Sequence, residues 1–180
     1  MEPDNDDMVD TRRLHRYRTP TARKHARPNR AELVNTVRGL SEEDARRRLV
    51  ASMTTPIGLV KHAAVAERVW FQHILGGLAK SECGGGMTTG DASFFVDDRE
   101  SLADVISEFE RTSQRSRTIA AGFDLDDVRT HPVLGEVNLR FIYLLAIEDF
   151  ARHAGHGDIL REQIKQQQLR QRPWELTLFD

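Results

Sequence analysis

Residues 138–163, NLRFIYLLAIEDFARHAGHGDILREQ, form the longest stretch of helical periodicity in the sequence. Within it, Asp149, His153 and His156 are spaced four and then three residues apart, so on a helix both histidines lie within ~40° of the direction of the aspartate. The same face carries apolar residues, such as Leu145, that are expected to point into a core. Ionisable side chains on a buried stripe are costly unless a partner or a metal ion compensates them. The stretch therefore predicts a long helix that carries a functional centre.

Other parts of the chain combine helix start signals with apolar residues at helical spacing. The pattern predicts helices at residues 29–38, 41–49, 57–75 and 101–121, before the long helix that follows Asn138. The expected N-cap residues are Ser41, Thr54 or Thr55 before Pro56, Ser101 with Asp104 as a capping box, and Asn138.

No segment alternates polar and apolar residues as a half-buried strand would, and no internal repeat is found. Residues 79–98, which are rich in Gly, Ser and Thr, are predicted to form a long loop, and residues 123–135 a connection. The expected fold class is therefore all-α, a four-helix bundle with one long crossover loop.

The chain is expected to contain one domain between two tails. Residues 1–28 contain few large apolar side chains and change from an acidic to a basic block, which predicts a poorly ordered or irregular N-terminal tail. Residues 29–168 are predicted to form the bundle. Residues 169–180 lose the helical periodicity and are predicted to be a C-terminal tail.

Composition narrows the functional class. The 180 residues carry a net charge of −2, without the basic excess of a nucleic-acid-binding protein. The single cysteine, Cys83, excludes an intrachain disulfide and fits a reducing cytosol. No apolar run approaches the ~18 residues that cross a membrane, and the acidic N-terminus lacks the pattern of a signal peptide. These features predict a cytoplasmic soluble protein that binds neither nucleic acid nor membranes.

The predicted second main helix adds one more histidine to the candidate chemistry. His62 lies on the apolar face of that helix, one turn from its start. Together with Asp149 and His153 it offers two imidazoles and a carboxylate, a set that suits a divalent transition metal and leaves positions for water or substrate. By spacing alone, the same residues also suit a hydrogen-bonded polar network in the bundle core.

The string IEDFARHAGHGDILRE, preceded by NLRFIYLLA, closely resembles the last helix of the DinB/YfiT-like superfamily. The match is closest to the branch that contains the mycothiol-dependent maleylpyruvate isomerase N-terminal domain and the mycothiol transferases. The segments GLSEEDARRRL, TPIGLVKHAAVAERVWFQHILGG and SLADVISEFERTSQRSR follow in the order of the family, so the resemblance covers roughly residues 29–163. It implies a DinB-like four-helix bundle.

In that family a divalent ion, usually zinc and sometimes nickel, is held by a histidine on the second helix and by two ligands four residues apart on the last. The resemblance therefore implies His62, Asp149 and His153 as metal ligands, with an aspartate where the family often has a glutamate. His156, the second histidine of the HAGH string, is expected to support the site or line its wall rather than bind the ion.

Three further charged residues of the last helix are candidates for the site. Asp158 is predicted to orient a ligand histidine as an outer carboxylate, the alternative being that it faces water. Arg152 and Arg161 are candidates for binding an acidic thiol cofactor or substrate, the alternative being that they are solvated or form salt bridges.

The resemblance implies a metal-dependent S-transferase or isomerase that uses a low-molecular-weight thiol, mycothiol in this branch, and acts on a small electrophile. A bound metal lowers the pKa of a thiol, so that a thiolate forms near neutral pH. The alternative is a non-enzymatic metal-binding or stress-related interaction bundle with a degenerate site. No catalytic residue is assigned. A homodimer is an expected assembly, because bundles commonly pair through an outer helix face.

Overall fold

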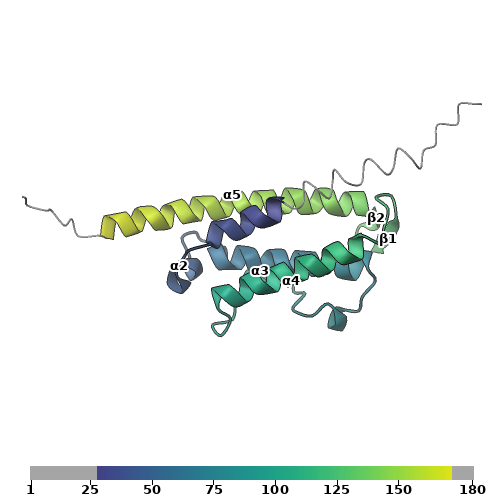
Figure 1. Ribbon diagram of the computed structural model, residues 1–180, viewed down its shortest axis with the longest axis horizontal. Helices are drawn as coiled ribbons and strands as arrows, with labels where there is room; N and C mark the ends of the chain where they lie inside the picture. The colour runs from purple at the N-terminus through teal and green to yellow at the C-terminus, as the bar shows by residue number, and fades with distance from the viewer. Residues whose placement is uncertain (1–27, 172–180) are drawn as a thin grey trace, which may run out of the picture.

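The structure is a computed structural model that describes residues 28–171. Four long helical segments lie side by side (Figure 1). They are a first helix at residues 28–37, α3 (Pro56–Glu67) with its continuation η1 (Arg68–Leu75), α4 (Leu102–Ala120) and α5 (Leu139–Gln171). A short helix, α2 (Glu42–Arg46), follows the first. The predicted all-α four-helix bundle is confirmed.

The predicted tails lie almost entirely outside the described residues, although residues 28 and 169–171, at the predicted boundaries, are helical. In the described part of the chain, no helix is long and apolar enough to cross a membrane.

The helices begin where the sequence predicts. At four helix starts, a side-chain oxygen of the N-cap residue accepts a hydrogen bond from a backbone N–H of the first turn, which satisfies one of the unpaired donors at a helix end. The caps are Ser41, Thr55, Ser101 and Asn138. Each helix then turns its apolar face toward one continuous core, which includes Leu33, Leu59, Val105, Phe109, Ile142 and Phe150.

Two helix ends that contact each other differ from the prediction. The short helix predicted at residues 41–49 ends at Arg46, because Arg47 has an extended backbone. Its guanidinium donates a hydrogen bond to Gln167 near the end of α5. This contact supports α5 to Gln171, beyond the weakening of its apolar periodicity. The partners are 120 residues apart in sequence, so no local pattern announces the contact.

The second main helix changes its hydrogen-bonding pattern halfway. From Arg68 to Leu75 the turns are π-helical, an arrangement that is rare and often found at functional sites. The sequence predicts one continuous helix here, because apolar periodicity does not distinguish the two patterns over so short a stretch. The π-helical turns carry Trp70 and Phe71, which line a cavity described below.

A β-hairpin replaces the connection predicted at residues 123–135. Strands β1 (Val128–His131) and β2 (Gly135–Asn138) pair antiparallel, with Val128 opposite Asn138 and His131 opposite Gly135. Strands of four residues are too short to give a clear alternation, which is why the sequence showed none. So short a hairpin needs packing against other elements. It receives this from Trp70, whose indole stacks on the His131 ring with centroids 5.0 Å apart.

The long loop between η1 and α4 is confirmed, and it contains two short 3-10 helices, η2 (Lys80–Glu82) and η3 (Gly90–Phe94). Buried Arg68 anchors it by donating to the Gly86 carbonyl and pairing with Glu108 of α4. The chain passes so close to this guanidinium that a Cβ at Gly85 would lie 2.5 Å from Arg68 Cζ. The anchored loop carries η3 to the flank of α3.

Candidate metal centre

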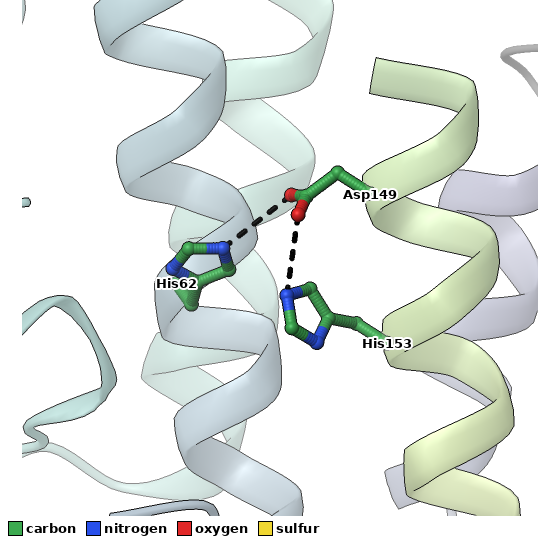
Figure 2. Close-up of side chains that lie close together, drawn as sticks. All are labelled: His62, Asp149 and His153. Carbon is green, nitrogen blue, oxygen red and sulfur yellow. Dashed lines mark ion pairs between the residues drawn. The ribbon is translucent and has the colours of Figure 1, made fainter. Parts of the chain in front are cut away.

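The structure brings three predicted ligands together from two helices. His62 of α3 and Asp149 and His153 of α5 point toward one another across the gap between the helices (Figure 2). Asp149 lies between the rings: its Oδ2 is 3.4 Å from His62 Nε2, and its Oδ1 is 3.3 Å from His153 Nε2. One potential ligand atom from each residue lies within 4.8 Å of the other two. The short aspartate side chain thus reaches both imidazoles.

A serine from the loop sets the protonation of His62. The hydroxyl of Ser93 donates to the Gly90 carbonyl, and its oxygen lies 2.7 Å from His62 Nδ1. Since the single hydroxyl proton is used toward Gly90, Ser93 Oγ accepts from His62 Nδ1–H. In the neutral ring, Nε2 is then unprotonated and its lone pair faces Asp149.

An aromatic ring packs against both histidines. The Phe94 ring stacks on the His62 imidazole with centroids 4.4 Å apart and an interplanar angle of 2°. It meets the His153 ring edge-on at 5.6 Å. His153 Nδ1 is buried and has no hydrogen-bond partner among the described residues, so the ring is oriented by its contact with Phe94 and by Asp149 at Nε2. The loop residues Ser93 and Phe94 therefore hold the His62 ring in one plane.

The electrostatics of the cluster favour a bound positive charge. Burial raises the pKa of the Asp149 carboxyl, but hydrogen bonding and charge from His153 and His62 outweigh burial and hold the pKa well below its usual value. When the His62 ring is protonated only at Nδ1, the Nε2 lone pair faces the Asp149 carboxylate, whereas a ring that is also protonated at Nε2 donates to that carboxylate. Two such acceptors need a proton or a cation between them.

The donor set fits a divalent transition metal. Two imidazole nitrogens and one carboxylate oxygen are borderline-to-hard donors of the kind that zinc and nickel accept. The outer nitrogen of His62 is hydrogen-bonded to Ser93, the arrangement that orients metal-binding histidines in proteins. Three protein ligands leave coordination positions for water or a substrate.

A largely apolar cavity of about 320 Å³ adjoins the cluster. His62 and Asp149 form part of its wall, and the remaining walls come from other residues of α3 and α5, from η1, from the loop at and around η3, and from the hairpin. His131 and Trp70 lie among the residues that line it. The candidate metal centre is therefore accessible to a small molecule.

Other predicted site residues lie outside the three-residue cluster. His156 is exposed, with its ring 5.6 Å from that of His153. Asp158 is also exposed, and within residues 28–171 it is Ser93, not Asp158, that hydrogen-bonds His62. Cys83 is buried and its Sγ lies 3.4 Å from the Ala79 carbonyl. Burial raises the pKa of this thiol, which disfavours a reactive thiolate.

The two candidate arginines have different surroundings. Arg152 is exposed and pairs with Glu148, one turn earlier on α5. Arg161 Nη1 donates to three carbonyls at the end of the first helix, those of Asn35, Thr36 and Arg38. Their binding of an anionic thiol or substrate stays a prediction.

Sequence reasoning did not identify the loop residues of the site. Ser93 and Phe94 occur in the stretch DASFF, which contains no motif, and Ser93 lies 31 residues from His62 in sequence. The one signal was the length of the loop, since long loops in compact domains are often functional. His131 was missed together with its hairpin.

Comparison with known proteins identifies the family of the chain. No curated protein and no solved structure matches the chain. A family model described as mycothiol S-transferase matches residues 24–166, which include all four main helices and the three clustered residues. The chain therefore belongs to the mycothiol S-transferase family.

Proposed function

We propose that this protein is a divalent-metal-dependent S-transferase that joins mycothiol, or a similar low-molecular-weight thiol, to a small electrophile. One observation carries the proposal. His62 Nε2 lies 3.4 Å from one oxygen of the Asp149 carboxylate, and His153 Nε2 lies 3.3 Å from the other. Family membership supports the thiol.

His62, Asp149 and His153 would hold the ion, with zinc the first candidate and nickel the second. When bound, the ion supplies a Lewis acid that lowers the pKa of a thiol, so that a thiolate is present near neutral pH. In the transfer, the S–H bond breaks and its proton goes to solvent. The sulfur forms a bond to an electrophilic carbon, and the electron pair of the bond to the leaving group departs with that group.

The remaining residues of the site would orient the ligands and bind the substrate. Ser93 accepts a hydrogen bond from His62 Nδ1–H, which keeps the lone pair of Nε2 available to bind the ion. Phe94 fixes the ring plane and covers one side of both histidines. The adjoining apolar cavity would bind the electrophile and reduce its contact with water. A reducing cytoplasm, predicted from the single cysteine, would suit such a reaction.

Metal analysis of protein purified without an affinity tag tests the first part of the proposal. We expect about one divalent ion per chain, lost in His153→Ala and retained in His156→Ala. His156 is the matched control because it lies one turn further along the same helix and is exposed. Metal-free wild-type protein, or equal metal in the two variants, would contradict the proposed centre.

A thiol-transfer assay then separates an enzyme from a metal-binding bundle. Metal-loaded protein is mixed with mycothiol and a model electrophile, with and without a chelator. We expect thiol-dependent conjugation that stops when the metal is removed. Absence of conjugation with mycothiol and with other low-molecular-weight thiols would leave the non-enzymatic alternative.

A further inference from the structure

The cavity beside His62 and Asp149 has chemistry that the metal cluster does not explain. It extends from these residues to Trp70 of η1 and His131 of the hairpin. Its volume of about 320 Å³ suits one small organic molecule rather than a macromolecular segment. A molecule placed there would lie within reach of the proposed ion. The residues that line the cavity therefore indicate what kind of electrophile the site accepts.

Charge excludes one class of substrate. Among the described residues, no lysine or arginine lines this cavity, and its one acid is Asp149 of the candidate metal centre. The nearest basic side chains on α3 and η1 are used elsewhere: Lys61 pairs with Glu108, and Arg68 pairs with the same carboxylate and with the loop. An anionic substrate would lose its hydration without gaining a protein cation.

The walls favour flat rings. Trp70 stacks on His131 with an interplanar angle of 15°, and Phe71 and Phe150 also line the cavity. Aromatic walls gain more from an aromatic ligand than from an aliphatic one of equal area, because ring faces and edges carry complementary partial charges.

The His131 ring is locked in place by the turn of its own hairpin. Its Nδ1 accepts hydrogen bonds from the backbone N–H groups of Val133 and Leu134, at 3.2 and 3.1 Å. An Nδ1 that accepts leaves the proton of the ring on Nε2. His131 therefore lines the cavity as a preorganised ring whose Nε2 remains free to donate a hydrogen bond.

We propose that this cavity binds the electrophile, and that it selects an uncharged aromatic compound that stacks within the wall formed by Trp70 and His131. The interpretation of the cavity as a substrate site rests on the proposed function. It departs from the prediction that arginines bind an acidic substrate, since neither Arg152 nor Arg161 lines the cavity. The reactive carbon of the substrate would lie toward Asp149 and His62.

Binding can be measured without turnover, using Trp70 as the reporter. The protein has two tryptophans, so Trp174→Phe leaves only the one in the cavity. The probes are methyl 4-nitrobenzoate and 4-nitrobenzoate, which share a quenching ring and differ in charge. Titration uses the full chain as purified and after treatment with a chelator. Comparing the two separates attraction of the 4-nitrobenzoate carboxylate to the proposed ion from binding to the protein itself.

In the chelator-treated protein we expect the ester to bind roughly tenfold more tightly than the acid, because the acid must leave its hydration shell. Methyl cyclohexanecarboxylate, which lacks the flat ring, should compete about fivefold less well than methyl benzoate. Equal binding of ester and acid would overturn the charge selection. Equal competition by the two rings would overturn the aromatic selection.

Variants locate the binding in this cavity. Ala66→Phe and Val69→Phe each place a ring into its lining and should weaken ester binding at least about tenfold. Ala151→Phe on the exposed face of α5 should leave binding unchanged. If ester binding persists in both folded cavity variants, as judged by circular dichroism, the inference is wrong. Because the assay needs neither ion nor thiol, its failure is distinct from failure of the metal and conjugation tests.

Discussion

Ser93 Oγ accepts a hydrogen bond from His62 Nδ1–H at 2.7 Å and donates its own hydrogen bond to the Gly90 carbonyl. This relay decides which nitrogen of His62 faces Asp149. A loop residue thereby prepares a helix residue for metal binding. The loop itself is held by Arg68 of η1, whose buried side chain contacts α4 and the chain around Gly86.

The relay predicts that Ser93→Ala weakens metal binding without removing a ligand. Loss of the acceptor frees His62 to place its proton on Nε2, and losing a partner of this kind typically lowers metal affinity by about 10–100-fold. The measurement is a competition titration with a chromogenic chelator. Ser81→Ala, in the same loop but exposed, is the control and should retain wild-type affinity. Identical affinities in the two variants would argue against the relay.

The Glu108 carboxylate predicts how stability depends on pH. Burial raises its pKa, but hydrogen bonds and charge from Lys61 and Arg68 outweigh burial, so the pKa in the folded protein lies below the ordinary value near 4.5. A lowered pKa contributes stability that is complete above the unfolded-state pKa and is lost as the pH falls through the folded-state value. We therefore expect Glu108→Gln to cost about 3 kcal/mol at pH 7, because it leaves Arg68 buried without its counter-charge.

Urea unfolding of wild type and Glu108→Gln between pH 7 and pH 3 measures this difference. The gap in unfolding free energy should shrink as the pH falls, since the wild type then also loses the carboxylate charge. Glu110→Gln, exposed on the same helix, should show little difference at any pH. A difference in unfolding free energy that stays constant across this pH range would mean that Glu108→Gln acts through packing and not through the lost charge.

Two glycines of the HAGHGD string predict opposite effects of alanine. A Cβ at Gly157 would lie 2.6 Å from Thr36 Oγ1 and 2.7 Å from Thr36 Cβ, where α5 crosses the first helix. Gly157→Ala should therefore destabilise the fold by about 1–3 kcal/mol. Gly155 has no atom within 4 Å of such a Cβ, so Gly155→Ala should stabilise α5 by about 0.5–1 kcal/mol. Thermal or urea unfolding compares the two, and a stabilising Gly157→Ala would contradict the close crossing.

The two arginines predicted to bind anions are expected to differ in how much each contributes to the stability of the fold. Arg161→Met removes the donor that serves three helix-end carbonyls and should cost about 1–2 kcal/mol. Arg152→Met removes an exposed pair with Glu148 and should cost less than about 0.5 kcal/mol. Urea unfolding measures both costs. Equal costs would show that the contacts of Arg161 add nothing beyond those of a surface residue.

The local features of the fold were predictable because they depend on neighbours in sequence. Ser101 with Asp104 and Asn138 cap helices through residues three positions away, and the apolar spacing of α5 identifies its buried face. The hairpin was not predictable in this way. Its four-residue strands carry too little pattern, and it is supported by the stacking of His131 on Trp70, a residue far away in the chain.

The sequence by itself determined which residues of α5 share a face, because the 3.6-residue period of a helix places Asp149 and His153 together wherever that helix packs. The family resemblance pointed to His62, on the second main helix, as their partner. Only the tertiary structure decided that Asp149 reaches both imidazoles, that Ser93 selects the nitrogen of His62, and that Trp70 and His131 face the same cavity. These relationships join segments 30 to 90 residues apart, and packing between distant segments, not a local period, sets their geometry.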